Sequence, residues 1–514
     1  MSPPFARRRV PAVVALAASL ALALGAGVAL HYHRLGLTLT HYDARGHLVV
    51  ARRIADSITP GWQQIGAVWL PLPHLLNALP VQVDRFYRTG ASGVAISVVS
   101  FAIATGAIAW IVLTLTESAF AAVAATLVFA LNPNVLYLQS TPMTEPLLVA
   151  LTTVAVAMSI PIAAQAFRPA RSRSSPEERR DADNSAERTP TAVGWAFALA
   201  CLTRYEAWPV TASALALTAI ARWRAGHRLP DAVRAALSIA VYPVLAIVAF
   251  AIFSRVVIGQ WLVTSGFFVP ENKAIGDAPL VAREIAWGTA TLSSEPLVWI
   301  AVAGLVATAI VALADRRRAH ALVVIALVAT AAIPFAAFYR GHPFRIRYMI
   351  PLVAAEAIGA GLAAGLIRRA HVAGAVVVIA LTASTLRPLD SAAPMVTEAQ
   401  WDRPNLPARA QVTGCLGTPR PGEKIMASMG SLGHYMQEAS DEGFAIRDFL
   451  HEGNGDIWLA AIEHPRPFAA WILIEEKAEG GDMLARITRE RPWFLDGYSR
   501  TCEGAGLVLY KRTP

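Results

Sequence analysis

The chain has 514 residues, of which 55% are hydrophobic and only 16% are charged. Soluble domains carry about a quarter charged residues, so this composition excludes an ordinary soluble protein and predicts an integral membrane protein. The formal net charge is +9, but the excess of Lys and Arg lies in short segments between apolar runs, where basic residues orient membrane helices. Nucleic-acid binding is therefore not expected.

The first apolar run follows three arginines at 7–9. A basic start, an apolar run and small residues at its end are typical of a signal peptide. Because many apolar runs follow, an uncleaved signal-anchor helix is the favoured interpretation. With either interpretation, the chain that follows this run begins outside the cytoplasm.

The stretch HYDARGHLVVARRIADS at 41–57 comes next. Its apolar residues lie on one stripe of a helix and its charged residues lie elsewhere, which predicts a helix in the membrane interface. The apolar piece VWLPLPHLLNALP at 68–80 extends this interfacial region. Arg52 and Arg53 either contact lipid headgroups or serve a functional site, and the sequence leaves both interpretations open.

Apolar runs then recur along the chain, and a membrane-spanning helix needs about 20 apolar residues. With the first run they predict about eleven spans. The segments assigned to the cytoplasmic side are rich in arginine, as positive-inside orientation requires, and the polar loop at 168–190 is predicted to be disordered. The runs lie at 91–115, 118–137, 144–165, 191–204, 207–221, 235–258, 296–314, 321–338, 349–367 and 371–386.

The C-terminal region has a different pattern, in which short strand-like runs alternate with helix-like segments that begin near Gly. This predicts a membrane domain at 1–386, a Pro-rich linker at 387–419 and a small extracytoplasmic α/β domain at 420–514. Cys415 and Cys502 flank that domain. They either form a disulfide, as an oxidising compartment allows, or are two unrelated buried thiols.

Ionisable residues gather at the outer ends of the predicted spans. Charge at membrane level is costly unless it is paired or faces water, so such residues are functional candidates. Glu145 has a structural alternative as an N-terminal carboxylate stabilised by the helix dipole, and Arg345 and Arg347 have one as ion-pair partners of Glu145 or Glu206. The candidates are Asp43, Arg45, His47, Glu145, Arg204, Tyr205, Glu206, Lys273, His342, Arg345, Arg347 and Tyr348.

The order of these motifs resembles the GT-C superfamily of polyprenyl-phosphate-sugar-dependent glycosyltransferases. The features are an Asp-bearing outer loop after the first span, the NP…S.PMTEP turn at 132–146, LTRYEAW at 202–208 and RIRYMIPL at 345–352. Within the superfamily, the protein O-mannosyltransferase and aminoarabinose transferase group is the most similar. The resemblance implies a polytopic α-helical enzyme of a bacterial-type cytoplasmic membrane. It would move a sugar from a polyprenyl-phosphate donor to a protein, lipid or glycan acceptor on the outer face.

The resemblance also implies roles for individual residues. Asp43 matches the first-loop carboxylate and would act as general base while the acceptor attacks the anomeric carbon with inversion. Arg345 and Arg347 would hold the oxygens of the lipid phosphate, for which the planar guanidinium is suited. The residues themselves make Arg204, Tyr205 and Glu206 candidate contacts of the donor sugar or phosphate, and the sequence leaves open whether Arg204 pairs locally with Glu206 or reaches a separate partner. Lys273 is a candidate contact of phosphate or substrate. The family often has an Asp-Glu pair in the first loop, whereas here Ala44 follows Asp43, which argues against a mechanism that needs two adjacent carboxylates.

Other interpretations stay open at this stage. His41, Asp43 and His47 have the ligand chemistry for a divalent metal ion, which some relatives use, but no DxD pair accompanies Asp43. A transporter or flippase would also need many spans, although transporters gather charges near the membrane midplane on broken helices. A cell-envelope assembly protein that acts through its C-terminal domain is the third alternative.

Overall fold

The computed structural model describes residues 4–66, 68–164, 190–261, 272–477 and 480–514, so nearly all of the loop predicted to be disordered lies outside the described residues. The chain forms two compact units. The first, called here the helical unit, comprises Met1–His31, Ile96–Ser140 and Thr144–Val396. The second, called here the mixed unit, comprises Tyr32–Ala95, Thr141–Met143 and Thr397–Pro514. The division into three sequence domains stays a prediction.

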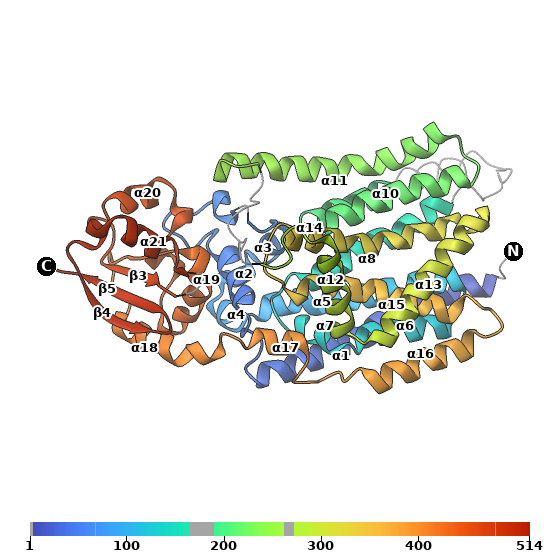
Figure 1. Ribbon diagram of the computed structural model, residues 1–514, viewed down its shortest axis with the longest axis horizontal. Coiled ribbons are helices and arrows are strands. Elements are labelled where there is room, and N and C mark those ends of the chain that lie inside the picture. The colour runs from blue at the N-terminus through green and yellow to red at the C-terminus, as the bar shows by residue number, and fades with distance from the viewer. Residues whose placement is uncertain (1–3, 67, 165–189, 262–271, 478–479) are drawn as a thin grey trace. The chain divides into compact units, whose positions relative to one another are not determined.

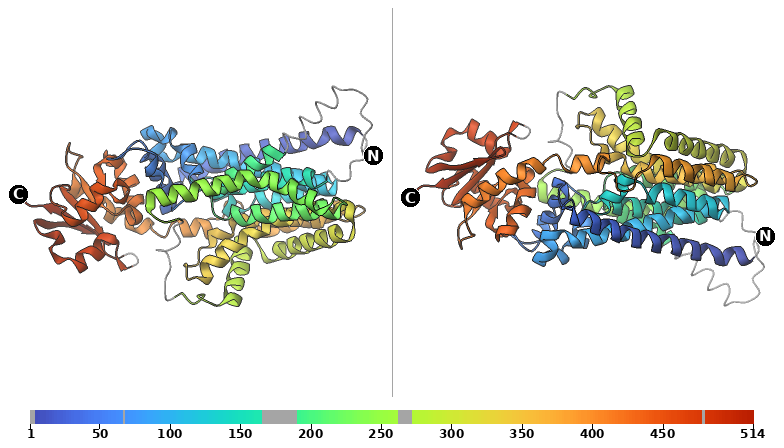
Figure 2. Two further views of the ribbon diagram at one scale, coloured as in Figure 1. Left: turned by 90° about the horizontal axis from the view of Figure 1, so that it is seen from above. Right: turned by 90° about the horizontal axis from the view of Figure 1, so that it is seen from below.

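Long apolar helices run alongside one another in the helical unit (Figures 1 and 2). In the part of the chain that the structure describes, seven are long and apolar enough to cross a membrane, so this is a multi-pass membrane protein. The first lies within α1 (Pro4–Arg34). The others are α5 (Ala91–Thr116), α8 (Glu145–Ala164), α11 (Leu229–Ile258), α13 (Glu295–Ala314), η4 with α14 (Arg316–Ala331 and Ala332–Tyr339) and η5 with α15 (Ile346–Met349 and Ile350–Gly365).

Shorter helices complete this unit: α6 (Ala119–Ala130), α7 (Pro133–Leu138), a helix at Pro190–Cys201, α10 (Ala207–Arg224), α12 (Ala278–Leu292), α16 (His371–Thr385) and the start of α17 (Pro394–Ala399). The predicted apolar runs coincide with these helices to within a few residues. One run, 118–137, is instead two helices, because Asn132 caps α7 and Pro133 has no amide hydrogen with which to continue α6.

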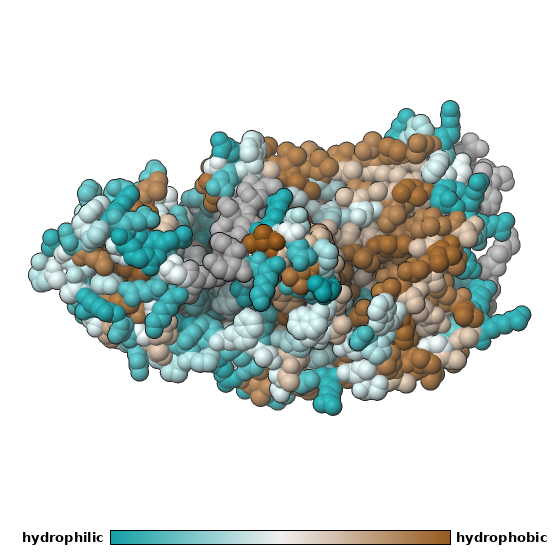
Figure 3. All heavy atoms as spheres, in the orientation of Figure 1, coloured by the Kyte–Doolittle hydropathy of each residue, from teal (hydrophilic) through white to brown (hydrophobic). Residues whose placement is uncertain are grey.

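The outer surface of the helical unit has many apolar side chains. Large apolar side chains such as Leu245 of α11 and Ile310 of α13 are exposed. Apolar surface covers much of the helical unit in Figure 3, as expected where the solvent is hydrocarbon. Inside the unit, α13 and α15 approach each other through glycines. A Cβ atom added at Gly359 would lie 2.5 Å from the carbonyl oxygen of Ala301, and one added at Gly304 would collide with the carbonyl of Gly359. Small residues at a helix contact are what close packing in a membrane requires.

The mixed unit combines helices of the first loop with the C-terminal region. Its sheet has the order β2-β1-β3-β5-β4, in which β1 is parallel to β2 and β3 while β5 is antiparallel to β3 and β4. This confirms the small C-terminal α/β fold predicted from the sequence. The strands are β1 (Ile425–Ala427), β2 (Phe449–Leu450), β3 (Trp471–Glu475), β4 (Tyr498–Gly504) and β5 (Leu507–Arg512).

The helices of the mixed unit come from both ends of the chain. The first loop contributes α2 (Tyr42–Arg52), α3 (Leu72–Asn77) and α4 (Asp84–Thr89), and the C-terminal region contributes α18 (Leu406–Leu416), α19 (Met429–Glu438), α20 (Asp456–Glu463) and α21 (Met483–Glu490). A disulfide joins Cys415 of α18 to Cys502 of β4, with 6.4 Å between their Cα atoms.

Helix α2 differs from the interfacial helix predicted from the sequence. Its Leu48 and Val49 are buried in a core that also contains Leu432 and Tyr435 of α19. An amphipathic stripe needs an apolar partner, and here a protein helix supplies it. The second predicted piece does have exposed apolar side chains, among them Leu79, which is 84% exposed.

Arg52 and Arg53 also have protein partners. Arg52 forms ion pairs with Asp56 and Asp84 at 2.9 and 2.6 Å. Arg53 donates a hydrogen bond from Nε to the carbonyl oxygen of Gln64 and another from Nη1 to the sulfur of Met429. These contacts hold the two side chains in the structure.

Candidate active site

The NP…S.PMTEP segment connects several helices of the helical unit. The side-chain amides of Asn132 and Asn134 both donate to the carbonyl oxygen of Leu292, at 2.8 Å each, and so fix α7 to the end of α12. Gln139 donates from Nε2 to the carbonyl of Gly25 in α1, at 3.2 Å. The first part of this motif therefore has a packing role.

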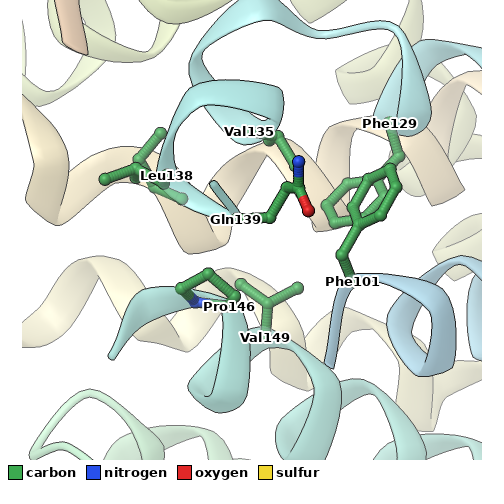
Figure 4. Close-up of a pocket in the computed structure, with 8 residues that line it drawn as sticks. Phe101, Phe129, Val135, Leu138, Gln139, Pro146 and Val149 are labelled. Carbon is green, nitrogen blue, oxygen red and sulfur yellow. The ribbon is translucent and has the colours of Figure 1, made fainter. Parts of the chain in front are cut away.

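Gln139 reaches into a small apolar pocket between α5, α6, α7 and α8 (Figure 4). Phe101, Phe129 and Val149 are among the side chains that line it. Its Oε1 atom has no hydrogen-bond partner among the described residues. The pocket is lined by apolar side chains and a single side-chain amide. One amide is too few polar groups to orient a sugar.

Three candidate residues meet at the first turn of α8. Arg204 lies with Nη1 3.0 Å from Oε1 of Glu145 and with Nη2 2.7 Å from Oε1 of Glu206. Arg204 also donates from Nη1 to the hydroxyl of Thr144 at 3.1 Å. Burial would lower the pKa of Arg204, but the charges of Glu145 and Glu206 outweigh burial and raise it. The group is a buried cluster in which two carboxylates share one guanidinium.

A second guanidinium lies close to this cluster. The Cζ atom of Arg347 is 5.5 Å from the ring centroid of Tyr348, and the Cζ atom of Arg204 is 5.9 Å from the same centroid. The hydroxyl of Tyr348 is 3.4 Å from Nε2 of His342. The structure thus brings together Glu145, Arg204, Glu206, His342, Arg347 and Tyr348, called here the arginine cluster.

The remaining candidates of the helical unit have other surroundings. Tyr205 packs its ring edge-on against Trp208, with 5.1 Å between centroids. Arg345 is partly exposed and Lys273 is exposed. Asn272, which precedes Lys273, donates from Nδ2 to the carbonyl of His342 at 2.7 Å, so this segment is anchored beside the arginine cluster.

Asp43 lies in the first turn of α2 in the mixed unit and is buried. Its backbone N–H donates to Nδ1 of His41 at 3.1 Å, and Nε2 of His41 is 3.7 Å from Oε1 of Glu398. Arg45, two residues on, forms an ion pair with Glu438. Asp43 is therefore held on a helical turn between His41 and Arg45, each of which lies against a carboxylate.

His47 belongs to an aromatic and histidine cluster. Its Nδ1 atom is 3.0 Å from Nε2 of His74, and its ring centroid is 4.1 Å from that of Trp69. Burial, and next the charge of Arg53, lower the pKa of His74 to about 3, so its ring is neutral at pH 7.

These positions do not fit the metal set considered from the sequence. The Nδ1 atoms of His41 and His47 already have protein partners. Among the described residues there is no group of three or more His, Cys, Asp or Glu that could hold a metal ion. We therefore derive no catalytic step through a metal.

The comparisons with known proteins give a fold. No family model and no curated protein matches the sequence. Among solved structures, ArnT from Cupriavidus metallidurans in the apo state matches with a TM-score of 0.54 and 14% identity, over 95% of this chain and 97% of that one. This chain has an ArnT-like fold. The resemblance predicted from the sequence is thus confirmed as a likeness in fold.

Two further matches agree with the ArnT-like fold. ArnT bound to undecaprenyl phosphate matches with a TM-score of 0.53 and 13% identity, over 95% of this chain and 97% of that one. The oligosaccharyltransferase of Archaeoglobus fulgidus in the apo form matches with a TM-score of 0.50 and 12% identity, over 95% of this chain and 74% of that one.

The sequence reasoning missed several charged residues of the C-terminal region. Glu438, His434, Arg409, Asp402 and Glu398 all lie in the ion-pair networks of the mixed unit. One signal was available, because His434 and Glu438 are four residues apart and so share one face of a helix. Their partners could not be found from sequence, since no local pattern connects the first loop to residues after 397.

Proposed function

We propose that this protein is an inverting glycosyltransferase that moves a sugar from a polyprenyl-phosphate donor to an acceptor on the outer face of a bacterial-type cytoplasmic membrane. The arginine cluster is the observation that carries the proposal: two guanidiniums beside one tyrosine ring, in an ArnT-like fold. The binding of undecaprenyl phosphate by ArnT supports a lipid phosphate as the ligand. About eleven spans, with the C-terminal domain outside, complete this proposal.

The arginine cluster would stabilise the leaving group. When the bond between the anomeric carbon and the phosphate oxygen breaks, the phosphate leaves with the electron pair and gains negative charge. Fixed guanidiniums stabilise such charge without having to reorganise. Arg347 and Arg204 are assigned to the phosphate, with Arg345 and Lys273 as further donor contacts and His342 and Tyr348 as orienting groups. Glu145 and Glu206 hold Arg204 in place.

Asp43 would take the proton. The acceptor hydroxyl oxygen attacks the anomeric carbon from the face opposite the phosphate, which inverts the configuration, and the hydroxyl proton passes to the carboxylate of Asp43. A carboxylate suits this task because its basicity rises as it loses contact with water. The acceptor is a protein, lipid or glycan hydroxyl, or another nucleophile of that kind.

The test uses the full-length protein in detergent with polyprenyl-phosphate-linked sugars. Wild-type protein is expected to release polyprenyl phosphate, and Asp43→Asn is expected to release it at least about 100-fold more slowly, the usual range for loss of a general base. Asp496→Asn is the matched control, since Asp496 is exposed, and it should turn over normally.

Two outcomes would contradict parts of the proposal. Normal turnover by folded Asp43→Asn would remove Asp43 from the role of base. Neither turnover nor binding with any of several donor sugars would reject the glycosyltransferase and favour a transporter, a flippase or an assembly protein.

A further inference from the structure

Helix α19 of the C-terminal region contacts the first loop through several polar side chains. Gln437 donates from Nε2 to the carbonyl oxygen of Tyr87 at 3.2 Å, at the end of the first loop. Glu438 is the ion-pair partner of Arg45, in the first turns of α2. The apolar side chains of Leu432 and Met436 of α19 are buried in the same core as Leu48 of α2.

Glu438 is itself held from the other side. Arg409 of α18 donates to both of its carboxylate oxygens, from Nε at 2.8 Å and from Nη2 at 2.9 Å. Nη1 of Arg409 donates to Asp402 at 2.9 Å. A bidentate guanidinium fixes the plane of a carboxylate as well as its position. Glu438 therefore presents a carboxylate of fixed orientation to Arg45.

His434, one turn before Glu438, lies in the same network. Its Nε2 atom is 3.7 Å from Oδ2 of Asp402. Burial, and next the charge of Arg409, lower the pKa of His434 to about 4, while the charges of Asp402 and Asp43 act in the opposite direction. The ring is neutral at pH 7 and cannot store the proton that Asp43 takes, so the role left to this helix is positional.

We infer that Glu438 is a positioning residue for Asp43: through Arg45 it fixes the first turn of α2, and the C-terminal region is thereby part of the catalytic apparatus. This inference rests on the proposed function only in its kinetic part. The structural part, that Glu438 holds α2 in place, is independent of what the enzyme does.

The experiment compares Glu438→Gln and Glu438→Asp with wild type in the full-length protein. Glu438→Gln removes the charge that holds Arg45, so kcat should fall about 10- to 100-fold, as small misplacements of a catalytic group do, while KM for the polyprenyl-phosphate donor changes less than about threefold. Glu438→Asp keeps the charge and should recover part of kcat. Glu463→Gln is the control, because Glu463 forms an exposed ion pair with Arg491 in the same region, and it should leave kcat unchanged.

A second measurement separates failure of the inference from failure of the proposed function. Hydrogen exchange of the amides of residues 42–53 should speed up in Glu438→Gln, and exchange in α21 should not. If wild type has no donor turnover but α2 exchange rises as expected, the proposed function fails and the holding of α2 by Glu438 stands. Wild-type kcat together with wild-type α2 exchange in Glu438→Gln would overturn the inference, and so would a fall in kcat that Glu438→Asp does not recover at all. If Glu438→Gln does not fold, Glu438→Asp is compared with wild type instead. The same two measurements, kcat and the hydrogen exchange of α2, then decide.

Discussion

The ring centroid of Tyr348 lies within 6 Å of the Cζ atoms of two guanidinium groups, those of Arg204 and Arg347. Arg204 is paired with Glu145 and Glu206, so its charge is compensated within the protein. Under the proposed function, the planar guanidinium of Arg347 would contact the lipid phosphate. Loss of that planar donor is therefore expected to weaken donor recognition.

Replacing Arg347 tests this role. Arg347→Lys keeps the charge but loses the planar, bidentate donor, so kcat/KM for the donor should fall about 10- to 100-fold, or about 1.4 to 2.7 kcal/mol of transition-state stabilisation. Steady-state release of polyprenyl phosphate measures it. The matched control is Arg340→Lys, since Arg340 is an exposed arginine of the same loop. Equal kinetics for the two variants would contradict the assignment of Arg347.

At the residue scale, the sequence indicates side chains whose charge is costly in their local surroundings. It does not indicate ion pairs whose partners are distant in the chain. Glu145, Arg204, Glu206 and Arg347 are predicted as site residues because charged side chains at the ends of apolar runs are costly unless they are paired or functional. The pairing of Arg45 with Glu438 could not be found, because a charged residue in a loop is compatible with solvent, phosphate or a remote carboxylate. The arrangement within the arginine cluster was likewise open until the helices were packed.

Among the elements, helix α18 and strand β4 are connected by the disulfide between Cys415 and Cys502. The bridge closes a long loop, with a sequence separation of 87 residues. Closing a loop of this length in the unfolded chain lowers the entropy of that chain and stabilises the folded form by about 4 to 5 kcal/mol.

Reduction should therefore lower the thermal-unfolding midpoint of the mixed unit. Tryptophan fluorescence of the whole protein in detergent, with and without a thiol reductant, measures the shift. The variant with both Cys415→Ser and Cys502→Ser should unfold at the same midpoint as reduced wild type, and the reductant should not change that midpoint. An unchanged midpoint for reduced wild type would show that the bridge does not contribute to stability.

The positions of helices could be predicted from the sequence where a single physical requirement determined them. Crossing a membrane requires long apolar runs, and these matched the helices within a few residues. The direction that α2 faces was not decided in this way, since the same amphipathic stripe suits a membrane surface and a protein core equally well. The break between α6 and α7 was missed because Asn132 and Pro133 are only two residues inside an otherwise apolar run.

For the whole molecule, three histidines that are buried in the mixed unit are expected to lower stability in acid. Burial is the main cause that lowers the pKa of His74 and His451 to about 3 and that of His434 to about 4. In an unfolded chain a histidine has a pKa of about 6.5. Between these values the unfolded chain binds protons that the folded chain does not, so the free energy of unfolding decreases as pH falls from about 6.5 toward about 4.

The thermal-unfolding midpoint of the mixed unit should accordingly be level above pH 7 and decline below about pH 6.5. His434→Gln, which has no group that titrates in this range, should make the decline shallower. His464→Gln is the control, because His464 is exposed, and its profile should follow wild type. A midpoint independent of pH between 4 and 7 would rule out these buried histidines as the cause.

The contact between α13 and α15 limits which parts of the helical unit can rearrange. At Gly304 and Gly359 the two backbones touch without side chains between them. Side chains can change rotamer to let helices slide, but two backbones in contact have no such freedom. The pair should therefore move as one rigid block. Under the proposed function, an opening for the lipid donor would then occur between other helices.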